Sequence, residues 1–225
     1  MEWSQWLQGG PFLEVSFLME IKEERKKTIQ DIITKLSKIT YKIEIVDKNI
    51  DEIFDFFERG YPYDEGDPKS FYLHSLQLRL FVCLTRKRKV TLQIEKASSN
   101  ALMVNFWFFG SVFDAPEWDQ IGIKEDEIKD FTDFLNELFL AYEYKVGGIA
   151  IEKDVLDLFN SNETFPNENY RYENVSPDHF LKEPSHFIDI IWNEKYKKLS
   201  HIPFSHKRLD KEGILIKTGC FNGER

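Results

Sequence analysis

The sequence holds little cysteine and no cluster of metal-binding side chains. Two of its 225 residues are cysteine, Cys83 and Cys220, and no CxxC pair occurs. The five histidines form no HxH, HExxH or HxxxH pattern with a carboxylate at ligand spacing. Metal sites use such closely spaced ligands, so the sequence predicts no metal ion. Sparse cysteine is typical of a reducing compartment, and we expect a cytoplasmic protein.

Long apolar stretches are missing as well. No run approaches the roughly 20 apolar residues that a helix needs to span a bilayer. Met1–Gln5 lack the basic region and the apolar stretch that open a signal peptide. We therefore expect no membrane association and no secretion signal.

Familiar catalytic motifs are also missing. The sequence has no GxSxG, GxxxxGK or GxGxxG pattern. Glu20-Ile21-Lys22 has the acid–x–lysine spacing of PD-(D/E)xK nucleases, but the upstream acid that such a site needs is absent. His186 precedes an apolar run, where a structural histidine is commoner than a catalytic one. We predict no cofactor, and an enzyme with an unrecognised active site stays open as an alternative.

Acidic residues outnumber basic ones by 39 to 30, which gives a formal net charge of −9. A negative field repels nucleic acid and anionic membrane surfaces, so neither is an expected partner. The same field attracts a basic protein and accelerates its encounter. Acidity of this kind also keeps proteins soluble, and the sequence leaves both interpretations open.

Alternating hydrophobicity is the clearest pattern, and it runs from about residue 71 to residue 109. Leu76–Leu84, Val90–Glu95 and Leu102–Phe108 each place an apolar residue at every second position, with short turns between them. Parallel neighbours would need a longer crossover, so the short turns predict antiparallel pairing. The three runs together predict a three-strand meander.

The third strand of this meander is apolar on both faces. Phe106 and Phe108 lie on one face, and Trp107 and Phe109 on the other. Such a strand is either central in the sheet and covered on both sides, or the place where a partner docks. We favour the first interpretation, with a helix at 124–144 covering the face of Trp107.

The remaining patterns predict an α+β domain. Periodicity indicates helices 22–39, 51–58 and 124–144, and strands 13–21, 41–45 and 149–151. Helices 22–39 and 124–144 are expected to pack against a mixed or antiparallel sheet of about five or six strands. We expect residues 1–160 to form the main domain. Residues 161–225 are expected to form an irregular extension packed on it, with a helix or strand at 187–196 and a strand at 213–217.

Two loops combine acidic and aromatic side chains. Rings give large rigid contact areas and carboxylates pair with Lys or Arg, so the combination is typical of a surface that binds a basic protein. The alternative is that both are ordinary solvated loops whose rings turn inward. The candidate partner-binding residues are Tyr61, Tyr63, Asp64, Glu65 and Asp67 in the first loop and Asp114, Glu117, Trp118 and Asp119 in the second.

A family resemblance covers about residues 71–160. The segment Asn105–Asp119, the helix at 131–144 and the run from Gly147 to Ile151 behind it resemble the immunity proteins of bacterial polymorphic-toxin systems. The resemblance implies a small acidic α+β protein that binds a cognate toxin, often a basic nuclease, and covers the toxin's active site.

The sequence therefore favours a non-enzymatic acidic binding protein. An immunity protein that neutralises a basic toxin is the specific hypothesis. An enzyme with an unrecognised site and a structural or oligomeric interaction module are the alternatives. The identity of the partner and the oligomeric state are left open.

Overall fold

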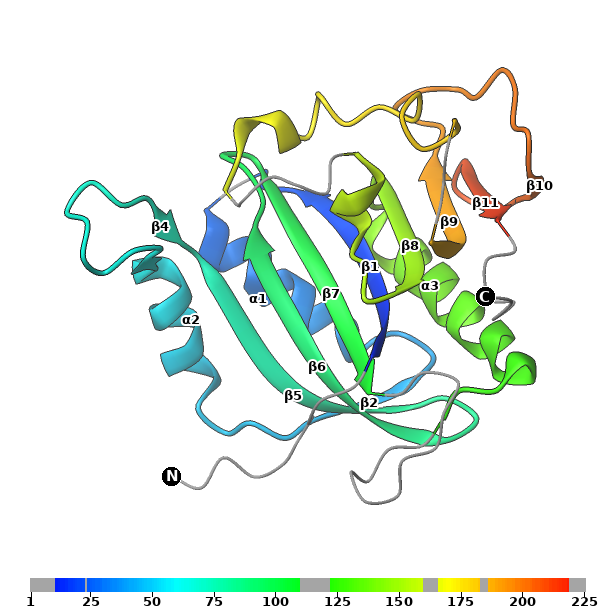
Figure 1. Ribbon diagram of the computed structural model, residues 1–225. Coiled ribbons are helices and arrows are strands. Elements are labelled where there is room, and N and C mark those ends of the chain that lie inside the picture. The colour runs from blue at the N-terminus through cyan, green and yellow to red at the C-terminus, as the bar shows by residue number, and fades with distance from the viewer. Residues whose placement is uncertain (1–10, 23, 110–121, 160–165, 183–185, 219–225) are drawn as a thin grey trace.

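One large antiparallel sheet dominates the fold (Figure 1). The computed structural model describes residues 11–22, 24–109, 122–159, 166–182 and 186–218. The described residues form a nine-stranded sheet in which all neighbouring strands are antiparallel. In spatial order the strands are β10 (Ser205–Arg208), β11 (Gly213–Lys217), β9 (Phe187–Asn193), β8 (Val146–Ile151), β1 (Phe12–Glu20), β7 (Ala101–Phe109), β6 (Lys87–Lys96), β5 (Ser75–Cys83) and β2 (Lys42–Ile45).

The predicted α+β class and the meander are both confirmed. β5, β6 and β7 pair in sequence order, and the sheet is larger than the five or six strands expected. The predicted helices at 22–39, 51–58 and 124–144 correspond to α1 (Arg25–Leu36), α2 (Ile50–Arg59) and α3 (Ile128–Tyr142). A single 3-10 turn, Glu125–Glu127, leads into α3. None of the helices that the structure describes is long and apolar enough to cross a membrane.

The main hydrophobic core lies between one face of the sheet and the helices. Phe106 of β7 meets Phe134 of α3 edge-on with ring centroids 5.3 Å apart, and Phe108 meets Phe131 in the same way at 5.0 Å. In Figure 1, α1 and α3 lie behind the sheet. The prediction that α3 covers the face of Trp107 is therefore wrong. The helix needs a wholly apolar face, and the strands beside β7 supply one only on the side of Phe106.

The opposite face of the sheet has an apolar half and a polar half. Over β8, β9 and β11, residues of the segment 155–182 form a second core with the strands, in which Tyr170, Phe180 and Trp192 are buried. Over β5, β6 and β7 the same face carries polar side chains such as Gln77, Gln93 and Asn105. In Figure 1 no described helix lies in front of these three strands.

The C-terminal part of the chain completes the sheet. β9, β11 and β10 extend it beyond β8, so the part of the chain expected to be an irregular extension supplies three strands of the main sheet. The expected strand at 213–217 is confirmed, and the open alternative at 187–196 is resolved as a strand. All seven residues of β9 are buried, so its sequence shows no alternation. Residues 166–182 match the expected irregular connection apart from one 3-10 turn, Glu168–Tyr170.

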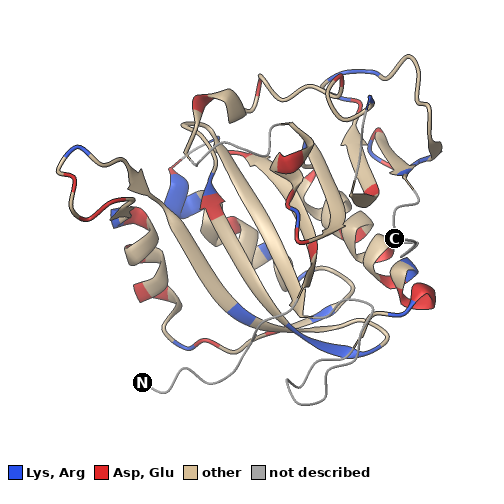
Figure 2. Cartoon of the chain, viewed as in Figure 1, with Lys and Arg blue, Asp and Glu red and all other residues tan. Residues whose placement is uncertain are grey.

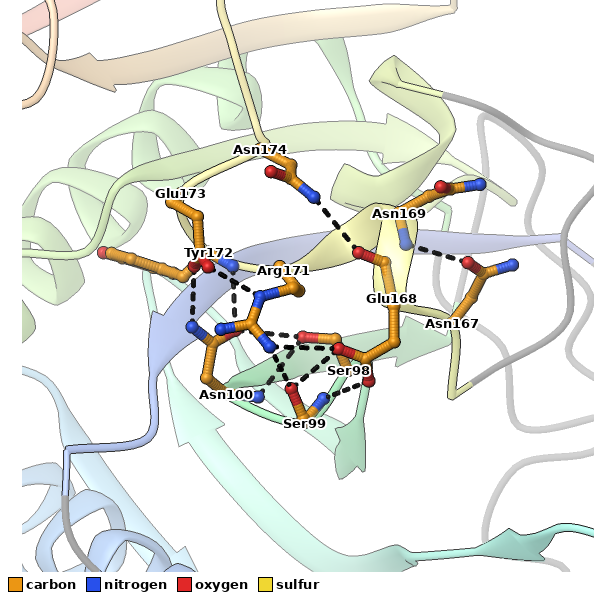
Figure 3. A network of polar contacts seen from close by, with 10 residues as sticks. All are labelled: Ser98, Ser99, Asn100, Asn167, Glu168, Asn169, Arg171, Tyr172, Glu173 and Asn174. Atoms are coloured by element: carbon orange, nitrogen blue, oxygen red, sulfur yellow. Dashed lines mark hydrogen bonds and ion pairs between the residues drawn. The ribbon is translucent and has the colours of Figure 1, made fainter.

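A polar network fastens this irregular segment to the turn between β6 and β7 (Figure 3). Both carboxylate oxygens of Glu168 accept hydrogen bonds from Ser99, one from its backbone N–H at 2.9 Å and one from its hydroxyl at 2.7 Å. The guanidinium of Arg171 donates to Ser99 and to Glu173. The backbone N–H of Tyr172 donates to the side-chain oxygen of Asn100 in the same turn. We call this network the turn clamp, and it fixes the cover of the second core.

Candidate binding site

A small hairpin projects from the sheet directly after α2 (Figure 1). It pairs β3 (Tyr61–Pro62) with β4 (Tyr72–Leu73). Gly60, between α2 and β3, has a φ of 67°, a value that glycine adopts without strain. A Cβ at Gly60 would lie 2.7 Å from the carbonyl oxygen of Leu73. The imidazole Nδ1 of His74 lies 2.8 Å from the carbonyl oxygen of Phe57, which anchors the hairpin to α2.

Exposed aromatic rings are concentrated on this hairpin and on α2. Six large hydrophobic side chains are exposed in the described part of the chain, and five of them lie between residues 56 and 72. Their exposed fractions are 48% for Phe56, 37% for Tyr61, 58% for Tyr63, 42% for Phe71 and 55% for Tyr72. We call these five rings the hairpin patch. Exposed rings are costly in water, so their clustering indicates a contact surface.

Stacking holds four of the five rings of the hairpin patch in place. Tyr63 and Phe71 stack across the hairpin with centroids 4.9 Å apart, and Phe56 stacks on Tyr61 at 5.8 Å. Rings fixed in this way lose little conformational entropy when a partner covers them. These four rings are therefore fixed without any partner present.

Acidic residues surround the rings, as Figure 2 shows for α2 and for the loop between β3 and β4. Asp64 accepts a hydrogen bond from the backbone N–H of Gly66, and Asp67 accepts one from Lys69, each at 2.8 Å. These bonds shape the loop and leave the carboxylates of Asp64, Glu65 and Asp67 at the surface. They give the hairpin patch a negative rim.

A groove of about 490 Å³ runs beside the hairpin patch. β2 pairs only with residues 80–83 of β5, and α2 packs beside the rest of that strand. The groove opens between α2 and the first residues of β5, Ser75–Gln77. Its lining combines apolar and polar side chains, namely Glu52, Ile53, Phe56, Tyr61, Ser75, Leu76 and Gln77.

A cluster of polar side chains lies on the face of the sheet opposite α1 and α3, which we call the open face. Glu14 of β1 accepts a hydrogen bond of 2.5 Å from the side-chain amide of Asn105 on β7, and Trp107 stands opposite Glu14 in the strand register. Glu95 of β6 accepts a bond of 3.1 Å from Gln93. Asp154, which follows β8, contributes a further carboxylate close enough to act electrostatically on both glutamates. We call Glu14, Glu95, Asp154, Asn105 and Trp107 the carboxylate face.

Burial changes the acidity of this group. Burial raises the pKa of Glu14 to about 7, against the opposing effect of the hydrogen bond from Asn105. Burial and then the negative charge of Asp154 raise the pKa of Glu95 to about 7. Burial also raises the pKa of Asp154 to about 6, although it accepts the backbone N–H of Leu156. Carboxyl groups that titrate near neutrality are a common feature of functional sites.

The structure brings some of the predicted site residues together. Tyr61, Tyr63, Asp64, Glu65 and Asp67 share the hairpin, with the rings at the surface rather than turned inward. Asp114, Glu117, Trp118 and Asp119 lie outside the described residues.

Sequence reasoning missed the other members of both groups. Phe56, Phe71 and Tyr72 complete the hairpin patch, and the aromatic residues on either side of the loop were the available signal. Glu14 and Glu95 occupy the polar positions of alternating strands, a pattern that indicates solvent exposure. Only long-range packing places them half-buried beside Asp154.

Comparisons with protein-family models, with curated proteins and with solved structures found no match to this chain.

Proposed function

We propose that this protein is a binding protein that uses the hairpin patch to dock a protein with a basic surface. The observation that carries the proposal is the concentration of exposed rings, five of the six among the described residues, on one hairpin and its adjoining helix. Hot spots of protein interfaces are rich in tyrosine and other rings that are buried on binding.

Charge supports the choice of a basic partner. The rings lie beside Asp64, Glu65 and Asp67, and the whole chain carries a formal net charge of −9. A basic partner would place Lys and Arg side chains against this rim while its apolar centre covers the rings. A toxin neutralised by an immunity protein is the specific partner class that we propose.

Co-expression tests this function in cells. The probe is a toxin-like, basic protein encoded next to the gene of this chain, produced from an inducible promoter. Wild-type protein is expected to restore growth, and the double variant Tyr63→Ala/Tyr72→Ala is expected to fail. Both rings are more than half exposed, so their removal leaves the fold intact.

Tyr196→Ala is the matched control. It removes the one exposed large hydrophobic side chain of the described residues that lies outside the hairpin patch. It should protect as well as the wild type. Equal protection by all three proteins would contradict a role for the hairpin patch, and no protection by the wild type would contradict a neutralising function.

A further inference from the structure

We propose that the carboxylate face is a binding site for an organic cation, an alkylammonium or guanidinium group. The site shares no residue with the hairpin patch and does not depend on the proposed protein partner.

The carboxylates of this face have no cationic partner among the described residues. Glu14, Glu95 and Asp154 form none of the ion pairs of the described chain. Lys153, whose charge acts on Asp154, forms its ion pair with Asp157 at 3.4 Å. Buried carboxylates are stable as anions only when a cation or several donors face them.

Asn105 gives an independent indication of a ligand. Its side chain is 1% exposed, and its amide nitrogen already donates to Glu14. The amide oxygen, fixed beside that carboxylate, has no hydrogen-bond partner in the part of the chain that the structure describes. A buried acceptor without a donor is uncommon in folded proteins and costs free energy. The missing partner is a hydrogen-bond donor located next to Glu14.

The chemistry of the site selects the ligand class. The two glutamates, Asp154 and the amide oxygen of Asn105 are acceptors, and the indole N–H of Trp107 is the one buried donor of this face without a partner among the described residues. Ammonium and guanidinium groups are donors only, so they match the acceptors, which are in the majority. The indole of Trp107, which stacks on Phe12 at 5.9 Å, adds a ring surface of the kind that organic cations contact. Among the described residues, no three acidic, His or Cys side chains are close enough together to hold one metal ion. An extended organic cation with several N–H groups reaches separated carboxylates, and a single metal ion does not.

Calorimetric titration with spermidine, agmatine and a short arginine peptide tests this site. Glu14→Gln and Glu95→Gln each remove one charge and keep the side-chain shape, and each is expected to weaken binding about tenfold or more. Glu212→Gln removes one charge from an exposed side chain between β10 and β11 and should bind like the wild type. Tyr63→Ala/Tyr72→Ala should also bind like the wild type, which separates this site from the hairpin patch.

Proton release gives a second readout that does not depend on variants. Glu14 faces Asp154 and Asp157 from the segment after β8, and Glu95 faces Asp154 and Tyr61. A bound cation stabilises the ionised carboxylates, so binding at about pH 6.5 should release protons. Titration in two buffers with different heats of ionisation measures the number released.

Binding of the free amines with the expected variant pattern supports the site and identifies a small-molecule source. Binding of the peptide alone, with the same pattern, supports the site with a partner's side chain as the source. Absence of binding by all three probes, or equal affinity in all variants, overturns the proposal.

Discussion

Carboxylates in this protein occupy two contrasting environments. Asp64 and Asp67 are exposed and shape a turn by accepting backbone N–H groups. Glu14 and Glu95 lie half-buried on the open face of the sheet, where burial raises the pKa of each to about 7. The same residue type thus provides a charged rim at one place and a group that titrates near neutrality at another.

Replacing Glu14 with glutamine should change how stability depends on pH. The folded-state pKa of Glu14 lies at about 7, above the ordinary value of 4.5. Its contribution to the unfolding free energy is therefore complete below pH 4.5 and is lost as pH rises through 7. Wild type should therefore lose unfolding free energy relative to Glu14→Gln between about pH 5 and pH 8. Each pKa unit corresponds to about 1.4 kcal/mol, and partial exposure reduces the expected total to about 1–2 kcal/mol.

Urea denaturation of both proteins across this pH range measures the difference. Glu212→Gln, which alters an exposed carboxylate, should follow the wild-type curve. A constant difference between wild type and Glu14→Gln from pH 5 to pH 8 would show that the carboxyl is not perturbed.

Gly60 is the residue on which the position of the hairpin depends. The variant Gly60→Ala should lower the unfolding free energy by more than about 1 kcal/mol, since alanine is strained at positive φ. The added Cβ would also lie within 2.7 Å of the carbonyl oxygen of Leu73 and 2.8 Å of the His74 ring. Gly66→Ala, in the exposed loop, is the control and should change stability by less than about 0.5 kcal/mol. Equal melting of the two variants would contradict this account.

At the scale of elements, alternation in the sequence was enough to predict the strands with one polar face. β5 and β6 alternate between buried and more exposed residues, and both were predicted. β9 and β10 do not alternate, since every residue of β9 is buried and every residue of β10 is exposed. The pairing of β9 with β8 joins distant parts of the chain, which local periodicity does not report. β10 pairs with β11 in a short local hairpin, but its wholly exposed residues give no alternating signal.

The sequence predicted the part of the candidate site that lies in one loop, because local composition shows which residues share a loop. It did not predict the residues that only long-range packing adds to the site. Tyr61 and Tyr63 stood out because rings and acids share one loop. Phe56 lies in the predicted helix 51–58, where the sequence alone did not single it out, and only the packing of α2 leaves it 48% exposed. The carboxylate face combines side chains of β1, β6 and β7 with Asp154, and no local pattern joins them.

The turn clamp makes a prediction about local stability. Glu168→Ala removes both acceptors for Ser99, so the backbone N–H of Ser99 should exchange with solvent severalfold faster. Global unfolding free energy should change little, since the network is exposed and screened by solvent. Hydrogen exchange measured by NMR, with Glu212→Ala as control, checks this. Unchanged protection of Ser99 would show that Glu168 does not hold the turn.

At the scale of the whole molecule, the sheet presents two differently built surfaces. The hairpin projects from one end of the sheet (Figure 1), and the carboxylate face is formed by side chains of β1, β6 and β7 and by Asp154. The formal net charge of −9 acts on any ligand before contact is made. Long-range attraction and short-range ring contacts should therefore affect different steps of binding.

Salt should slow the approach of a basic partner more than it speeds its departure. Raising ionic strength from about 0.05 M to about 0.5 M shortens the screening length and should lower the association rate constant about tenfold or more. Asp64→Asn/Glu65→Gln should weaken this salt dependence, and Glu212→Gln should leave it nearly unchanged. Stopped-flow association with the neighbouring toxin-like protein provides the rates. An association rate independent of salt would contradict the electrostatic part of the account.

The most direct test of the central claim is the dissociation constant of that complex for wild type and for Tyr63→Ala/Tyr72→Ala. Loss of two hot-spot rings should weaken binding about 100-fold, mainly through faster dissociation. Tyr196→Ala should bind as tightly as the wild type. An unchanged dissociation constant in the double variant would show that the hairpin patch is not the docking surface.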